Sequence, residues 1–155
     1  LYKYIVDELD KILKKNIRIK IIGNVNKFPK FLKLKLKEAE KKTNKNTKIQ
    51  LNIALNYGSK EEIINSVKKL NKLSLKINEK NISKNLYTKN IPDPEILIRT
   101  GNRFRLSNFL LWQSSYTEIF FIKKLWPDFN KSDFRKILIK FKKMRRSFGG
   151  IKWVN

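Results

Sequence analysis

Residues 49–70 read IQLNIALNYGSKEEIINSVKKL, and this stretch decides the fold class. Its first part, Ile49 to Leu55, is rich in apolar residues and predicts a strand. Asn56-Tyr57-Gly58 then ends the strand. Ser59 and Glu62 have the spacing of a capping box, so we expect a helix to begin there. A strand joined to a helix by a short turn is the repeating unit of α/β folds.

Strands and helices continue to alternate on both sides of this stretch. Upstream, apolar spacing predicts helices at 2–15 and 28–42 and a strand at 17–23 between them. Downstream we expect a short helix and a loop within 71–90, a strand at 96–98 ending at Arg99, a helix from Ser107 to Trp112, a strand at 118–122, and a last helix capped by Asn130 and Asp133 and ended by Gly149-Gly150. The sequence therefore predicts one α/β domain over residues 1–155, with a mostly parallel β-sheet flanked by helices.

The composition limits the chemistry that is open to this chain. It has 37 basic and 13 acidic residues, a net charge of +24, which suits nucleic acid, anionic membrane or phosphorylated substrates. A genome rich in AT codons also explains 30 Lys, 20 Ile and 17 Asn, and we favour that source of the charge. The seven Arg residues are then more informative than the Lys residues. With no Cys and no His, a metal must be held by oxygen ligands, which indicates Mg²⁺ or a similar ion.

Two candidate sites lie in the C-terminal half. Arg99 ends a strand at a glycine turn, and Arg105 and Ser107 follow, so these residues and a helix N-terminus at Ser107 would suit a diphosphate. The alternative is that the arginines pair with Asp93 or Glu95.

Glu118 lies in the apolar strand 118–122, where a buried carboxylate needs an arginine, hydrogen-bond donors or a metal as its partner. The alternative for Glu118 is a surface position on the polar face of the strand.

Six longer motifs follow one another along the chain: 51–58 (LNIALNYG), 93–101 (DPEILIRTG), 105–113 (RLSNFLLWQ), 116–121 (YTEIFF), 125–129 (LWPDF) and 148–150 (FGG). Together they resemble the undecaprenyl diphosphate synthases, a family of cis-prenyltransferases. The resemblance runs over nearly the whole chain, in order. It implies an enzyme that condenses isopentenyl diphosphate onto an allylic diphosphate of the farnesyl type, giving a long cis-polyprenyl diphosphate. In bacteria that product becomes the lipid carrier of cell-wall biogenesis.

The resemblance also assigns roles to individual residues. Arg99, Arg105 and Ser107 match the family's isopentenyl diphosphate contacts, and Glu118 matches its magnesium ligand near the interface of a homodimer. The implied location is the cytoplasm, with peripheral contact to the inner face of the membrane left open. Apolar strand residues would line a product tunnel or simply pack the core: Leu51, Ile53, Leu55, Ile96 and Ile98.

The chain departs from the family pattern at several places. Asn102, Arg103 and Phe104 replace the usual Gly-Glu-His, Lys60 replaces a common Arg, and Ser147 interrupts an arginine run. The family's Asp-Gly-Asn-Gly-Arg-Trp-Ala loop, with its catalytic Asp and allylic site, is absent. We therefore expect an N-terminally truncated domain that lacks a strand and helices, is inactive as given, and exposes the edges of the strands at 17–22 and 49–55.

Two other readings of the sequence remain open. A non-catalytic partner subunit or degenerate relative is favoured by the changes at 102–104 and opposed by the presence of Arg99, Arg105, Ser107 and Glu118. A basic nucleic-acid-binding domain would carry a clustered basic stripe with exposed aromatic residues. Here the lysines are spread through every expected helix, so we expect no specific nucleic-acid partner.

Overall fold

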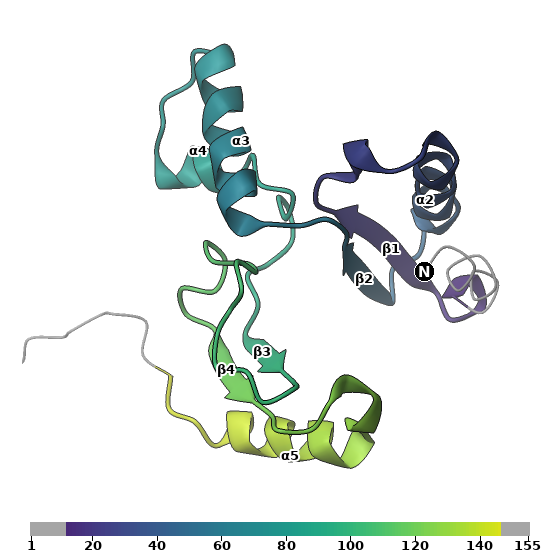
Figure 1. Cartoon of the computed structure of the whole chain (residues 1–155), viewed down its shortest axis with the longest axis vertical. Coiled ribbons are helices and arrows are strands. Elements are labelled where there is room, and N and C mark those ends of the chain that lie inside the picture. Colours follow the sequence, from purple (N-terminus) through teal and green to yellow (C-terminus); the bar gives the residue numbers. More distant parts are fainter. Residues whose placement is uncertain (1–11, 147–155) are drawn as a thin grey trace, which may run out of the picture. The chain divides into compact units, whose positions relative to one another are not determined.

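The computed structural model describes residues 12–146 (Figure 1). The chain divides into two compact units between Asn90 and Ile91. Each unit contains one pair of parallel strands with helices beside it, so the predicted α/β class is confirmed. The expectation of a single domain stays a prediction. Of the helix expected at 2–15, residues 12–14 are helical, Lys15 lies in a turn, and residues 2–11 lie outside the described residues. No helix between residues 12 and 146 is both long and apolar enough to cross a membrane.

In the first unit, β1 (Ile17–Ile22) pairs with β2 (Ile49–Ala54), with Ile17 opposite Ile49 and Ile22 opposite Ala54. A 3-10 turn (Val25–Lys27) leads from β1 into α2 (Lys30–Thr43). The helix begins two residues later than predicted, directly after Pro29, because Phe28 precedes a proline and is extended, as such residues commonly are. Its buried side chains pack on the strand pair in the core cluster Ile19, Leu36, Ala39 and Leu55. Leu55, a tunnel candidate in the sequence, is therefore a core residue.

The outer edge of β1 is closed by side chains of α2 and of the loop that follows it. Thr43 Oγ1 accepts the backbone N–H of Ile19 at 3.0 Å, and Glu40 Oε1 accepts that of Ile21 at 2.8 Å. Asn46 Nδ2 donates to the carbonyl of Ile17 at 2.8 Å. Side chains thus occupy the groups through which another strand would pair, so the expectation of an open edge at 17–22 is wrong. Five of the six residues of β2 are exposed, in keeping with the expectation for that strand.

Helices α3 (Ser59–Lys72) and α4 (Glu79–Ser83) complete the first unit. The N-cap of α3 is Gly58, with no side-chain cap, so the predicted capping box is wrong. Glu62 is instead 2 % exposed and accepts hydrogen bonds from the Tyr57 hydroxyl at 2.5 Å and the Tyr87 backbone N–H at 2.6 Å. These two donors satisfy the buried carboxylate. Glu62 thereby connects the loop before α3 to the segment after α4.

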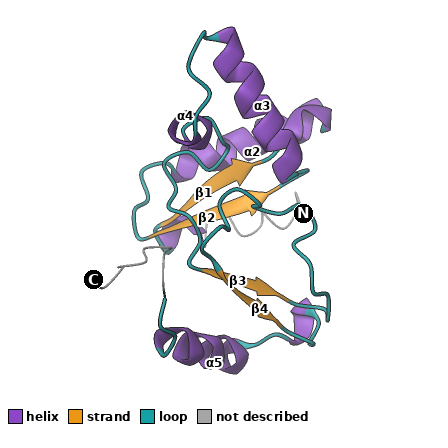
Figure 2. Cartoon of the chain, turned by 90° about the vertical axis from the view of Figure 1, so that its left-hand side faces the viewer, coloured by secondary structure: helices purple, strands orange, loops and turns teal. Residues whose placement is uncertain are grey.

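In the second unit, β3 (Ile96–Arg99) pairs with β4 (Glu118–Phe121), so that Ile96 lies opposite Glu118 and Arg99 opposite Phe121. After a 3-10 turn (Trp126–Asp128), α5 (Lys131–Lys142) runs beside this strand pair (Figure 2). The Lys140 ammonium of α5 lies over the ring of buried Phe120, with 5.8 Å between its nitrogen and the ring centroid. The capping box predicted at Asn130 and Asp133 is confirmed.

Two predictions about helices in this unit are wrong. Residues 107–116 form turns, and no helix starts at Ser107, whose φ of 50° is left-handed, as are those of Asn108 (61°) and Leu110 (47°). A right-handed helix needs negative φ at these positions. Helix α5 ends at Lys142, well before Gly149, which lies outside the described residues.

We predict that Thr43→Val lowers the free energy of unfolding by about 1–3 kcal/mol. The valine keeps the shape of this fully buried side chain but leaves the Ile19 N–H without its acceptor. Urea unfolding followed by circular dichroism measures the change. Thr47→Val is the matched control, because Thr47 is exposed and only its backbone N–H bonds, to Asn16. Equal loss in both variants would contradict the role given to Thr43.

Candidate functional site

The loop that follows Arg99 is held in place by the chain that follows β4. The Ile122 N–H donates to the Arg99 carbonyl at 2.8 Å, which extends the strand pairing by one bond. Beyond it, Gly101 N–H donates to the Lys124 carbonyl at 2.7 Å and Asn102 N–H to that of Ile122 at 3.1 Å. Gly101 has a φ of 87°, which a residue with a side chain adopts only with strain. The end of β3 is therefore a defined turn, at the edge of a parallel sheet where ligands commonly bind.

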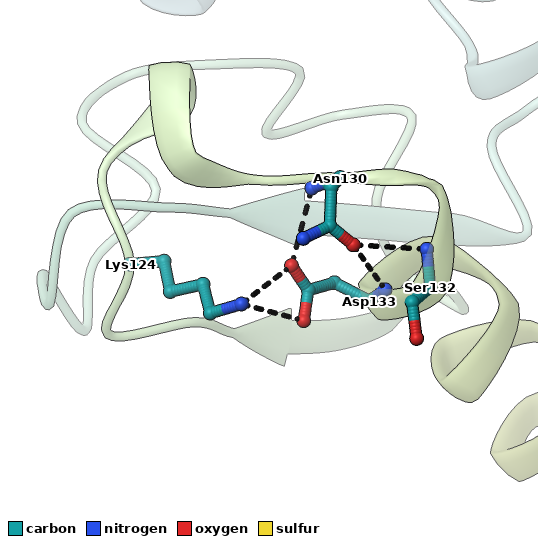
Figure 3. A network of polar contacts seen from close by, with 4 residues as sticks. All are labelled: Lys124, Asn130, Ser132 and Asp133. Carbon is teal, nitrogen blue, oxygen red and sulfur yellow. Dashed lines mark hydrogen bonds and ion pairs between the residues drawn. The ribbon is translucent and has the colours of Figure 1, made fainter.

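The N-terminus of α5 supports this turn through Lys124 (Figure 3). The Lys124 ammonium lies 3.0 and 2.9 Å from the two carboxylate oxygens of Asp133. Asp133 also accepts the Asn130 N–H, while the Asn130 side chain accepts the N–H groups of Ser132 and Asp133. The hydrogen bonds from Lys124, and then that from Asn130, lower the pKa of Asp133. The carboxylate thus joins the helix cap to the residue whose carbonyl holds Gly101.

The Arg99 side chain is half-buried, and its Nε is buried without a hydrogen-bond partner. Within residues 12–146 no ion pair involves Arg99 or Arg105, and Glu95 pairs with Arg146 instead. The alternative that Asp93 or Glu95 neutralises these arginines is therefore not observed. A buried guanidinium donor without an acceptor is rare in folded proteins and points to a group that the described residues do not supply.

Arg105 and Ser107 are both exposed, in the irregular segment between β3 and β4. No hydrogen bond among the described residues joins them to Arg99 or to each other. Because the helix expected at Ser107 does not form, a helix N-terminus contributes nothing to anion binding here. What the structure offers is one half-buried cation at a fixed turn and an exposed cation and hydroxyl beyond it.

Glu118 lies at the other end of the strand pair from Arg99. It is the first residue of β4 and faces Ile96, three residues before Arg99, a separation of about 10 Å along the strand. Its side chain is 29 % exposed, and its Oε1 lies 3.8 Å from Nε of Arg146. Glu118 is therefore a partly buried carboxylate with a cationic neighbour, and not a freely exposed surface residue.

The surroundings of Glu118 contain few other metal ligands. Glu95 shares a cationic neighbour with Glu118, because Arg146 Nη1 pairs with Glu95 Oε1 at 3.0 Å. No group of three or more acidic side chains within residues 12–146 could hold a metal ion. Asp93, Glu95 and Arg146 line one cavity of about 300 Å³, and burial raises the pKa of Asp93. The donors are oxygens, which suits Mg²⁺ bound by one or two carboxylates that share it with substrate phosphates.

Two residues of this region were not identified as functional from the sequence pattern. Arg146 interacts with Glu95 and Glu118, far away in sequence, and its position in an arginine pair was the only signal. The second is Phe104, whose ring packs on that of Phe121 at 5.2 Å between centroids. Because Phe121 is paired with Arg99, Phe104 covers the strand beside the candidate anion site with an apolar group.

Comparisons with known proteins agree on one family. Residues 1–149 match the family model described as "Putative undecaprenyl diphosphate synthase". An isoprenyl transferase of Heliobacterium mobile is 41% identical over 159 residues, covering 98% of this chain and 61% of that protein. A tritrans,polycis-undecaprenyl-diphosphate synthase (geranylgeranyl-diphosphate specific) of Picrophilus torridus is 38% identical, covering 90% and 58%. The chain thus spans about three fifths of the length of these relatives.

Solved structures agree with these sequence matches. The crystal structure of a probable undecaprenyl diphosphate synthase from Campylobacter jejuni superposes with a TM-score of 0.87 at 35% identity, covering 96% of this chain and 70% of that one. Lavandulyl diphosphate synthase from Lavandula x intermedia, in complex with dimethylallyl diphosphate, gives 0.88 at 29% identity, covering 96% and 68%.

We predict that Asp133→Asn lowers the melting temperature at neutral pH and speeds amide exchange at Gly101. The pKa of Asp133 is depressed in the folded state, so its contribution is present above its ordinary value of 3.8 and is lost as the pH falls through the folded value. The difference in melting temperature between Asp133→Asn and the unmodified chain should therefore shrink in acid. Asp128→Asn is the control, because Asp128 is exposed and has no side-chain partner among the described residues. A difference that is independent of pH would refute the electrostatic origin.

Proposed function

This chain belongs to the undecaprenyl diphosphate synthase family, and on that premise we propose that it is part of a prenyltransferase that condenses isopentenyl diphosphate onto an allylic diphosphate of the farnesyl type. Its product would be a long cis-polyprenyl diphosphate that serves as a lipid carrier. One relative is named an undecaprenyl-diphosphate synthase, and one similar structure contains dimethylallyl diphosphate. Both support isoprenoid diphosphates as the class of substrate. The proposed location is the cytoplasm, with or without peripheral contact to the inner face of the membrane.

The observation that carries the proposal is the half-buried guanidinium of Arg99 at the end of β3. Its unsatisfied Nε would donate to a diphosphate oxygen of isopentenyl diphosphate, and the pinned turn at Gly101 would keep the guanidinium in position. Arg105 and Ser107 would add a second cation and a hydroxyl from the exposed segment. Charge-assisted hydrogen bonds of this kind bind and orient the diphosphate, so that the isopentenyl double bond faces the allylic partner.

We propose Mg²⁺ as the cofactor, with Glu118 as one of its ligands. When bound, the ion would neutralise the charge that develops on a departing diphosphate. The partly buried Glu118 would hold one coordination position, and substrate oxygens would supply others. A homodimer is part of the same proposal. Exposed Tyr116, two residues before Glu118, and half-buried Trp112 are the candidate interface residues.

A non-catalytic relative is the second candidate, favoured by Phe104 at the position of the family's His and by its packing on Phe121. A partner subunit of this kind could keep the isopentenyl diphosphate contacts and still lack turnover. A protein that carries this segment within the full length of its relatives should therefore be assayed for prenyl transfer from farnesyl diphosphate. Turnover without a second subunit would exclude this candidate.

We predict that Arg99→Gln and Arg105→Gln each weaken binding of isopentenyl diphosphate to the 155-residue chain by about tenfold or more. The loss of one charge-assisted contact costs about 1.5–3 kcal/mol. Isothermal titration calorimetry measures the affinity, and circular dichroism checks that each variant is folded.

The control is Arg135→Gln, on the exposed side of α5, which removes the same charge. Unchanged affinity in folded Arg99→Gln and Arg105→Gln chains would contradict the assignment. Equal weakening in all three would mean that only net charge matters.

A further inference from the structure

The strand pair of the second unit has two different faces. Side chains alternate along each strand, and residues that are paired in a parallel register point to the same side, so Arg99 shares a face with Phe121. Leu97 and Ile119, two residues earlier on each strand, lie on that face as well. The other face carries Phe120, which is buried and has a cation of α5 over its ring. The face with Arg99 is therefore the one that α5 does not cover.

This uncovered face is apolar except at its end. Phe121 and Ile119 are each 37% exposed, and Leu97 is half-buried. Phe104, from the loop after β3, packs its ring on that of Phe121 with 5.2 Å between centroids and is itself 70% exposed. Arg99 stands at the carboxyl end of the face, and its buried Nε has no hydrogen-bond partner in the described part of the chain. An apolar surface that ends at such a guanidinium is complementary to a ligand with an anionic head and a hydrocarbon tail.

The backbone fixes where the Phe104 ring is presented. Two residues before it, Asn102 donates its N–H to the Ile122 carbonyl at 3.1 Å and has a left-handed φ of 55°. The loop thus leaves β3 in a defined direction and returns the ring to the strand pair. Along β3, Leu97 lies about 7 Å from Arg99. This length suits a short branched hydrocarbon that is joined to a diphosphate held at Arg99.

We propose that Phe104 is a specificity residue, and that its ring and that of Phe121 contact the isopentenyl hydrocarbon when Arg99 binds the diphosphate. This inference rests on the proposed function and adds the reason why the site takes an isoprenoid diphosphate in preference to other diphosphates. Hydrogen bonds from a guanidinium recognise the phosphate oxygens and do not distinguish one ester from another. Burial of hydrocarbon against the rings supplies the difference. Inorganic pyrophosphate, which the condensation releases, has no hydrocarbon and binds less tightly.

The test compares two ligands with the same anionic head, isopentenyl diphosphate and methyl diphosphate, by isothermal titration calorimetry on the 155-residue chain. We expect the unmodified chain to bind isopentenyl diphosphate about tenfold more tightly, because that ligand buries more hydrocarbon. Phe104→Ala should lose most of this preference and bind methyl diphosphate as the unmodified chain does. Arg99→Gln should weaken both ligands by similar factors and keep the preference.

Phe134→Ala is the matched control. It removes a ring that is 44% exposed from α5, and it should change neither affinity. Phe104→Leu keeps an apolar side chain at the site and should retain part of the preference. Circular dichroism checks that each variant is folded. If Phe104→Ala does not fold, the nuclear Overhauser effect between the isopentenyl methyl group and the Phe104 ring tests the contact in the unmodified chain. Its absence in the saturated complex would overturn the proposal.

The outcomes separate this inference from the function on which it rests. Equal affinity of the unmodified chain for both ligands would overturn the hydrocarbon contact and leave the diphosphate site at Arg99 in place. A folded Phe104→Ala chain that keeps the preference would do the same. An equal loss of affinity for both ligands in Phe104→Ala would mean that the ring only supports the turn, and would also overturn its role in specificity. Failure of the unmodified chain to bind either ligand would overturn the inference together with the proposed function.

Discussion

The pairing of β3 with β4 is the constraint on which the candidate site depends. It places Arg99 at one end of the strand pair and Glu118 at the other. The hydrogen bonds continue past both strands, from Ile122 to Arg99 and from Gly101 to Lys124. Because the strands are parallel, the turn after Arg99 lies beside the chain that leads to α5. Lys124 therefore connects the cap of α5 to the turn, because its ammonium binds Asp133 and its carbonyl accepts the Gly101 N–H.

Charge acts in this molecule through a few partly buried groups and much less through the large net charge. Most of the excess cations are lysines on exposed helix faces, where water and salt screen them. Arg99 and Arg146 are half-buried, and there a guanidinium is neutralised by specific acceptors or requires a ligand. The Nε of each is buried without a hydrogen-bond acceptor among residues 12–146, but Arg146 pairs with two carboxylates, whereas Arg99 has no ion pair among those residues. This contrast separates a structural cation from a candidate binding cation.

The first unit shows how buried polar side chains limit what can join the sheet. Thr43 and Glu40 accept the N–H groups of Ile19 and Ile21, so side chains take the place that a neighbouring strand would have at these groups. Glu62 and Ser66 face inward from α3, and Ser66 donates to the carbonyl of Ile82 at 3.1 Å. The bond of Ser66 joins α3 to α4, and the bonds of Glu62 join α3 to Tyr57 and Tyr87, which lie before α3 and after α4. The unit is thus held by a small apolar core together with specific polar contacts.

The sequence by itself determined the order and type of most elements, the family, and one helix cap. Those features depend on local patterns: β-branched runs at 17–22 and 49–54, helical apolar spacing, and an Asn130 and Asp133 pair that are three residues apart. Only the tertiary structure decided that residues 107–116 form turns, that Glu62 is buried, and that Arg146 reaches Glu118 and Glu95. The roles proposed for Arg99, Arg105, Ser107 and Glu118 remain predictions. The physical reason for the difference is range, because a cap or a strand involves neighbours in sequence. An ion pair between residues 95 and 146 depends on how two strands and a helix pack, and no local pattern specifies that arrangement.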